Sequence, residues 1–174
     1  GWTILTPADM GMPPPEIEEG FSTFNLSYIT ELEQIWVYTC DWIGPGPNSG
    51  RGVRWFDGDS WHGAESPVAN GCATSLDADQ QGNLWVGMDT GLWRYAISAD
   101  EWLHFPTPDV PEGWNFFGFV NQLNLAPNGD PWVTMQLCGG ASCFGGVARY
   151  QVSASTGTWS LIGEAAHDDD RMNI

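Results

Sequence analysis

The chain has 174 residues, with 22 acidic side chains, five arginines, no lysine and a formal net charge of −17. This charge argues against nucleic-acid binding, which needs basic contacts to phosphate, and against adsorption to an anionic membrane surface. No apolar run reaches about 18 residues, so membrane insertion is not expected.

Short runs rich in aromatic and β-branched residues alternate with Gly, Asp, Asn and Pro along the chain, and such runs predict β-strands. No segment keeps a period of about 3.6 residues, so almost no helix is expected. The predicted strands form three units of four, covering residues 27–31, 35–39, 52–56 and 60–62, then 73–77, 84–88, 91–96 and 101–105, then 122–126, 132–137, 146–152 and 158–162.

Several of the eleven tryptophans recur in phase with these units. One set lies at the start of the second strand of each unit, and the other set lies in the last strand. The two sets are Trp36, Trp85 and Trp132, and Trp2, Trp61, Trp102 and Trp159. Four-stranded repeats of about 40 to 50 residues are typical of β-propeller blades. The predicted fold is therefore all-β, a partial β-propeller with about three four-stranded antiparallel blades and a leading strand.

The second unit contains the phrase GNLWVGMDTGLWRY at residues 82–95. This phrase resembles the repeat of two-component-regulator-type β-propellers, and it is also similar to the repeats of streptogramin lyase-like propellers. The third unit departs from the pattern at Pro131, which precedes Trp132, and in the first unit Gly52 stands one residue closer to Arg54. The resemblance implies a propeller fold but does not imply a particular reaction.

Three blades are too few for a closed ring, because closed propellers usually have about four to eight. We expect a single partial β-propeller over residues 1–174. Its parts are the end of a blade over 1–24, blades over about 25–66, 67–110 and 111–166, and the start of the next unit over 167–174. The chain would then be a fragment of a larger propeller, with the remaining blades in the same or another chain.

An arginine follows a glycine by two or three residues in the third strand of each unit. These arginines are predicted to share one repeat position and to brace each blade by pairing with a carboxylate or a carbonyl oxygen. They are Arg54, Arg94 and Arg149. By the same alignment, Trp55 takes the place of Tyr95 and Tyr150 and is predicted to be structural.

The four cysteines predict two disulfides. Cys138 and Cys143 lie within one loop, and Cys40 and Cys72 fall at strand ends, where they could pair between neighbouring blades. An even cysteine count with one close pair favours an oxidising compartment, so the predicted location is extracellular or periplasmic. A zinc site is the alternative, but the three histidines are not in phase with the cysteines.

The long connections are predicted to lie on one face of the propeller. In a four-stranded meander, the second-to-third loops and the blade-to-blade links lie on the face opposite the other two turns. The long segments all belong to this face and cover residues 3–24, 40–51, 63–71, 106–120 and 138–145. Because loops on a rigid scaffold commonly carry function, we predict the binding surface here; the alternative is that loop length simply varies on this side.

Two tryptophans in these loops, Trp42 and Trp114, are out of phase with the repeat. Trp114 opens an apolar stretch that includes Phe116 and Phe117. Aromatic side chains are frequent anchors of recognition, so these four residues are the predicted apolar contacts. Packing beneath the loop is the alternative explanation for the stretch that begins at Trp114.

Asp41 and Asp89 both follow second strands and are the predicted polar contacts of the same surface. As alternatives, paired carboxylates can act in glycoside hydrolysis or bind calcium. Residues 77–82 also faintly resemble a calcium loop, although a hairpin turn explains them. We predict no cofactor and no metal ligand, with calcium as the alternative.

No set of a nucleophile and a base and no phosphate-binding loop can be assembled from the sequence. We therefore favour an extracytoplasmic propeller module that binds a small molecule, a glycan or a protein, without catalysis of its own. The alternatives are a propeller enzyme, either a lyase or a carbohydrate-active enzyme, and a structural subunit of an extracellular assembly. The histidine pattern of the lyases has no counterpart at His62, His104 or His167.

Overall fold

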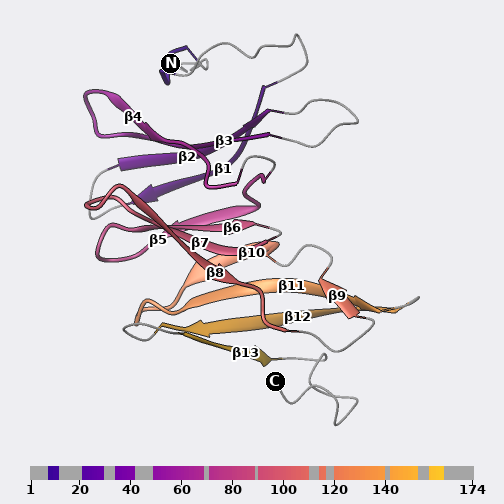
Figure 1. The fold of residues 1–174 in the computed structure, drawn as a ribbon. Coiled ribbons are helices and arrows are strands. Elements are labelled where there is room, and N and C mark those ends of the chain that lie inside the picture. The colour runs from indigo at the N-terminus through magenta and orange to yellow at the C-terminus, as the bar shows by residue number, and fades with distance from the viewer. Residues whose placement is uncertain are drawn as a thin grey trace. The chain divides into compact units, whose positions relative to one another are not determined.

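The computed structural model describes residues 8–11, 21–29, 34–41, 49–68, 71–88, 90–109, 114–116, 120–139, 142–152 and 157–162. Every regular secondary-structure element in these ranges is a β-strand, and the strands form three antiparallel sheets (Figure 1). The all-β prediction is therefore confirmed. Across the same ranges, no helix is long and apolar enough to cross a membrane. The chain forms two compact units, residues 1–73 and residues 74–174, which are described separately.

The first unit contains a four-stranded sheet in which each strand pairs with its neighbour in sequence. Its strands are β1 (Phe21–Ile29), β2 (Gln34–Asp41), β3 (Ser49–Phe56) and β4 (Trp61–Ala64). The rings of Trp36, Trp55 and His62 stack across β2, β3 and β4, with centroid separations of 4.6 and 5.3 Å. This stack joins three of the four strands through their side chains.

The segment after β4 is fixed to β2. The Tyr38 hydroxyl lies 2.8 Å from the Ser66 hydroxyl and donates to the Gly71 carbonyl at 3.1 Å. Burial raises the pKa of Tyr38 to about 12, so the phenol is neutral at physiological pH. Two residues further along β2, Cys40 is bonded to Cys72. The predicted Cys40–Cys72 disulfide is confirmed, and it lies within the first unit.

The second unit contains two further sheets. The second sheet consists of β5 (Ser75–Ala78), β6 (Leu84–Met88), β7 (Gly91–Ala96) and β8 (Glu101–Pro106). The third consists of β10 (Gln122–Leu125), β11 (Pro131–Gly139), β12 (Ser142–Gln151) and β13 (Thr158–Ile162), with β9 (Trp114–Phe116) paired to β11. The bounds of β6, β7 and β13 agree with the predicted ranges, whereas β9 was not predicted.

A shared apolar core joins the second and third sheets. Trp85 and Leu92 of the second sheet pack with Val133 and Tyr150 of the third. The Phe105 ring lies between them, 5.1 Å from Trp85 and 5.2 Å from Tyr150. Burial of this apolar surface is the main force that holds the two sheets together.

The repeat of the second-strand tryptophans is confirmed by the strand register. Trp36, Trp85 and Trp132 each lie near the start of the second strand of their sheet, opposite Trp55, Arg94 and Arg149 respectively. Three of the late tryptophans also occupy equivalent places, each opposite an aromatic residue of the third strand, and Trp2 lies outside the described residues. These pairs are Phe56 with Trp61, Tyr95 with Trp102, and Tyr150 with Trp159.

The predicted alignment of the three arginines is wrong for Arg54. In the register, Arg54 faces Val37 and takes the place of Trp93, while Trp55 takes the place of Arg94. It follows that Phe56, and not Trp55, is the counterpart of Tyr95 and Tyr150.

Glycine explains this shift of register. Gly52 and Gly91 both have positive φ, at 87° and 127°, and both face the last strand of their sheet. A Cβ atom on either residue would collide with a backbone carbonyl, that of Ala64 or that of Phe105. Gly52 and Gly91 therefore occupy equivalent places in their sheets. Arg54 follows Gly52 by two residues, whereas Arg94 follows Gly91 by three, so Arg54 lies one position away from the place of Arg94.

Candidate functional site

The third sheet is extended at one end. β11 and β12 have nine and ten residues, whereas β6 and β7 have five and six. The pairing with β10 ends at Thr134 and the pairing with β13 ends at Val147, so the two strands continue beyond both neighbours. We call this extension the ribbon; it comprises residues 135–139 of β11 and residues 142–146 of β12.

β9 is added to the ribbon from a different connection. Its residues Trp114, Asn115 and Phe116 pair with Gly139, Cys138 and Leu137 of β11. β9 belongs to the link between the second and third sheets, and the ribbon ends in a second-to-third-strand connection. These two kinds of connection therefore meet on one side of the third sheet, as the meander topology predicts.

The structure describes only part of the predicted site. Trp114 and Phe116 lie together in β9, and Asp41 is the last residue of β2, opposite Ser49. For these three residues only the backbone is described. The predicted contacts Trp42, Phe117 and Asp89 lie outside the described residues.

The predicted Cys138–Cys143 disulfide is confirmed. The two residues face each other across β11 and β12, with an S–S distance of 2.04 Å and a Cα–Cα distance of 4.1 Å. A sulfur atom in a disulfide is not available as a thiolate ligand, so neither Cys138–Cys143 nor Cys40–Cys72 forms the alternative zinc site.

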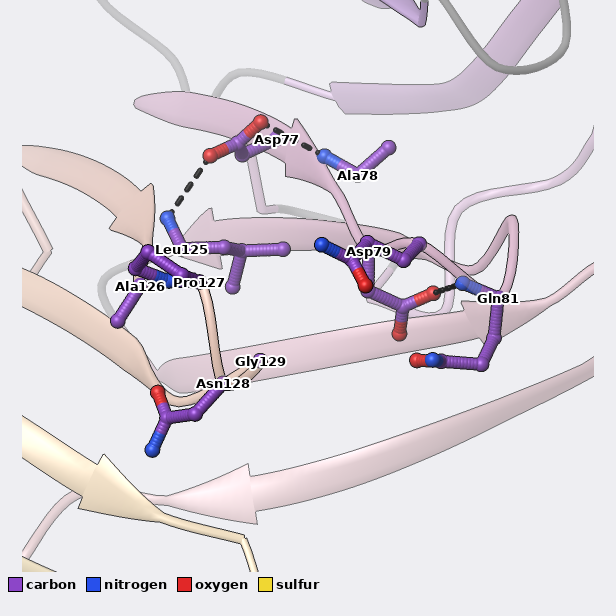
Figure 2. A pocket seen from close by; sticks show the side chains of 10 residues that line it. Asp77, Ala78, Asp79, Gln81, Leu125, Ala126, Pro127, Asn128 and Gly129 are labelled. Atoms are coloured by element: carbon purple, nitrogen blue, oxygen red, sulfur yellow. Dashed lines mark hydrogen bonds between the residues drawn. The ribbon is translucent and has the colours of Figure 1, made fainter.

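A pocket opens at the opposite end of the strands, between the first-to-second turns of the second and third sheets (Figure 2). Its volume is about 350 Å³. The turn after β5 and the turn after β10 form its two walls, and their backbones are equivalent. The Gly82 amide donates to Asp79 at 2.9 Å, and the Gly129 amide donates to Ala126 at 2.8 Å. The lining residues are Asp77, Ala78, Asp79, Gln80, Gln81, Leu125, Ala126, Pro127, Asn128 and Gly129.

Asp77 joins the two walls of the pocket. One carboxylate oxygen accepts the Ala78 amide at 2.8 Å, and the other accepts the Leu125 amide of β10 at 2.8 Å (Figure 2). A second bond links the same two sheets, because the Thr74 hydroxyl donates to the Val120 carbonyl. The inner strands β5 and β10 are therefore connected by hydrogen bonds as well as by the core.

Asp79 holds the first wall together. Its carboxylate accepts the amides of Gln81 and Asn83 at 3.0 and 2.9 Å, and it accepts the indole N–H of Trp85 at 3.1 Å. The Asp79 amide also donates to the Asn83 carbonyl at 3.0 Å. Residues 77–82 therefore end a strand and enter a hairpin turn, as the hairpin interpretation predicts. In the described part of the chain, no group of three or more His, Cys, Asp or Glu side chains is placed to hold a metal ion.

The exposed side chains at the rim of the pocket are three amides and Pro127. Gln80, Gln81 and Asn128 are exposed, and each amide offers both donors and acceptors. Asn128 uses one of its donors on Asp130, at 2.8 Å. This arrangement suits hydrogen bonding to a small polar molecule.

A second polar cluster lies in the third-to-fourth turn of the first sheet. The Nε2 atom of His62 lies 2.6 Å from Asp57 and 3.2 Å from the Ser60 hydroxyl. In a Ser–His–Asp triad the two partners bind different ring nitrogens, so this cluster is not such a triad. The amides of Ser60 and Asp59 and the His62 ring lower the pKa of Asp57 below its ordinary value. The cluster therefore stabilises its turn.

The arginines of the repeat brace their sheets in three ways. Arg54 donates to the Val53 and Ala64 carbonyls at 2.9 and 3.3 Å, as predicted. Arg149 donates to the Asp130 carboxylate through Nε at 3.0 Å, also as predicted. Arg94 instead lies over the Trp85 and Phe105 rings, at 5.4 and 5.8 Å from their centroids.

Sequence reasoning did not identify the pocket or the Asp77–Leu125 bond. A usable signal was present, because the turns after β5 and β10 have equal length and similar composition. If the first strands of neighbouring repeats lie side by side, then these turns must also lie side by side. The acid at position 77 then faces a backbone amide of the next repeat.

No protein-family model matches the chain, and no curated protein matches it. Among solved structures, the chain is similar to one described as the extracellular domain of a one-component system, BT4673, from B. thetaiotaomicron. The sequence identity is 13% and the TM-score is 0.40. The similarity covers 93% of this chain and 31% of that chain, so this chain spans about a third of the other protein's length. A similarity at this level does not define a function.

Proposed function

We propose that the chain is part of a β-propeller and acts as an extracytoplasmic recognition module without catalysis of its own. The observation that carries the proposal is the ribbon with β9 on its edge. The second and third sheets share one repeat, yet only the third is extended, closed by a disulfide and joined by an extra strand. Such local elaboration of a regular scaffold is characteristic of binding loops.

The repeat supports the propeller part of this proposal. Each of the three sheets contains a four-stranded antiparallel meander, and equivalent tryptophans mark the second strand. The second and third sheets pack through one core, with their inner strands side by side. We therefore propose one partial propeller over residues 1–174, whose remaining blades belong to the same or another chain.

The two disulfides support a location outside the cytosol. Structural disulfides persist in oxidising compartments and are rare where thiols are kept reduced. Both cysteine pairs are bonded, one in each compact unit. The proposed location is extracellular or periplasmic.

We propose that the long connections, including the ribbon and β9, form the recognition surface. Its apolar contacts are Trp42, Trp114, Phe116 and Phe117, and its polar contacts are Asp41 and Asp89. Large aromatic side chains bury much area at low entropic cost, so they suit this role. The partner class is a small molecule, a glycan or a protein. Nucleic acids and anionic membranes are disfavoured by the net charge of −17.

A specific observation also favours a second binding site. The pocket of about 350 Å³ between the two turns has the size of a small-molecule site and carries exposed amides on its rim. It lies at the opposite end of the strands from the ribbon. The two sites can therefore be tested separately by mutation.

A ligand screen with two sets of variants tests the proposal. Binders are first selected from a glycan array and a library of small polar molecules. Affinity is then measured by calorimetry for Trp114→Ala and for the matched control Gln81→Ala. We expect Trp114→Ala to weaken binding by about tenfold or more and Gln81→Ala to leave it unchanged. The opposite result, in which only Gln81→Ala weakens binding, would move the site to the pocket.

A further inference from the structure

The ribbon is held at its base by the buried side chains of Met135 and Leu137 and at its outer end by the disulfide. It lies beyond the pairing with β10 and β13, and two-stranded ribbons are only marginally stable in water. Three of its five residue pairs contain a glycine: Gly146 opposite Met135, Gly145 opposite Gln136, and Gly139 opposite Ser142. A glycine contributes no side-chain contact across the strands. Beyond Leu137, the Cys138–Cys143 bond is therefore the main restraint on the outer end of the ribbon.

Cys138 also determines where β9 lies. On one side it is bonded to Cys143, and on the other side it faces Asn115, the central residue of β9. In the described part of the chain, β9 has three paired residues, and all of them pair with residues 137–139. The position of β9 therefore depends on this end of β11 staying extended.

The two disulfides of the chain differ in accessibility. Cys143 is exposed and Cys138 is half-buried, whereas Cys40 is 0% exposed and Cys72 is half-buried. Thiol–disulfide exchange requires a thiolate to reach a sulfur atom. A dithiol reductant can reach the exposed Cys143 in the folded protein, whereas neither Cys40 nor Cys72 is exposed.

We propose that the Cys138–Cys143 disulfide is a redox latch on β9, operated by an external dithiol. A thiolate of the dithiol attacks the Cys143 sulfur, and Cys138 leaves as a thiolate. The second thiol of the reductant then attacks the mixed disulfide, which releases Cys143. The protein takes up two electrons and two protons and ends with two thiols, while the reductant ends as a disulfide. Reduction frees the outer end of the ribbon and detaches β9 from β11, and oxidation restores both.

The latch has a functional consequence that rests on the proposed function. If β9 belongs to the recognition surface, then the oxidised protein presents a formed surface and the reduced protein does not. Pre-organisation of a binding segment strengthens binding because less ordering remains for the ligand to induce. Affinity would therefore follow the redox state of the surroundings.

Selective reduction is the first test. The full chain is incubated with increasing dithiothreitol, its free thiols are alkylated, and the modified cysteines are mapped by mass spectrometry. We expect Cys138 and Cys143 to be reduced at concentrations about tenfold lower than Cys40 and Cys72. Reduction of both pairs over the same range, or of Cys40–Cys72 first, would overturn the proposal.

Hydrogen exchange is the second test. We expect the amides of residues 114–116 to exchange about tenfold faster in the reduced protein and in the double variant Cys138→Ser/Cys143→Ser. The amides of β6 and β7 serve as the internal control and should not change. Unchanged protection of β9 in both reduced forms would overturn the latch. Faster exchange without a change in ligand affinity would support the latch and overturn the proposed recognition surface.

Discussion

In the second sheet, the buried carboxylate of the first turn belongs to Asp79, and in the third sheet it belongs to Asp130. These two positions are not equivalent. The backbone bonds align Asp79 with Ala126, because their amides donate to the carbonyls of Asn83 and Asp130, each at 3.0 Å. The carboxylate therefore stands at the first position of the turn in the second sheet and at the last position in the third sheet.

This displacement changes what the carboxylate holds. Asp79 accepts the indole N–H of Trp85, and the neighbouring Arg94 lies over aromatic rings. Asp130 accepts Arg149 and the Val152 amide. The repeat thus keeps the backbone of the turn, the position of the arginine and its cation–π contact with the second-strand tryptophan, since Arg149 lies 5.7 Å from the Trp132 ring centroid, and the third sheet adds an ion pair. Backbone geometry is the conserved part of these two repeats, and the polar partner is the variable part.

The largest expected effect separates the two tryptophans of these sheets. Trp85 is 1% exposed and lies in the shared core, whereas Trp132 is half-buried. We expect Trp85→Ala to lower the free energy of unfolding of the second unit by about 3 to 5 kcal/mol. Trp132→Ala should cost about 1 to 2 kcal/mol, because less apolar area is lost from the interior. Urea denaturation measures both, and equal losses would show that the two sheets bury their tryptophans alike.

The next effect tests the ion pair. Asp130→Asn removes the charge that Arg149 faces. Because hydrogen bonds to charged groups contribute about 1.5 to 3 kcal/mol each, we expect a loss of unfolding free energy of about this size. In the second sheet, Arg94→Met removes a cation–π contact, with an expected loss of about 0.5 to 1 kcal/mol. Both values follow from urea denaturation at neutral pH. If Arg94→Met cost as much as Asp130→Asn, then the two arginines would brace their sheets equally.

Sequence reasoning predicted the repeat well because its signals are local. A glycine in the third strand and a tryptophan in the second strand fix the register of each sheet, and both can be seen in the sequence. The same locality explains the error at Arg54. Matching arginine to arginine ignored the spacing from Gly52, although the positive φ of that glycine is what sets the register.

The parts that could not be predicted depend on contacts between repeats. β9 forms only because the ribbon offers an edge, and nothing in Trp114–Phe116 distinguishes a three-residue strand from a loop. The pocket forms only because two turns from different sheets come side by side. The two disulfides could be predicted because cysteine spacing and strand ends suggest their partners directly.

Acid should weaken the third sheet through Asp130. Burial alone would raise the pKa of this carboxyl, but Arg149, Asn128 and the Val152 amide outweigh it and hold the pKa below its ordinary value. A carboxyl with a lowered folded-state pKa stabilises the protein above its unfolded pKa of about 3.9, and this stabilisation is lost as pH falls through the folded value. The wild-type chain should therefore lose stability below about pH 4 more steeply than Asp130→Asn. Thermal melts from neutral to acidic pH measure this slope, and parallel curves would remove Asp130 from the explanation.

The smallest effect comes from rebuilding one turn as the other. Asp79→Ala removes the acceptor of Trp85, and Asn83→Asp alone places a second carboxylate next to Asp79. The double variant Asp79→Ala/Asn83→Asp reproduces the third sheet, with Ala at the first position and Asp at the last, near Arg94. We expect the double variant to lose less unfolding free energy than the sum of the losses in the two single variants. The difference, which is the coupling energy, should be about 1 kcal/mol and should shrink in high salt. A double-mutant cycle by urea denaturation at low and high salt measures the coupling. Strictly additive losses would mean that the arginine of the second sheet cannot reach the new carboxylate, and that the two turns differ in more than the position of one charge.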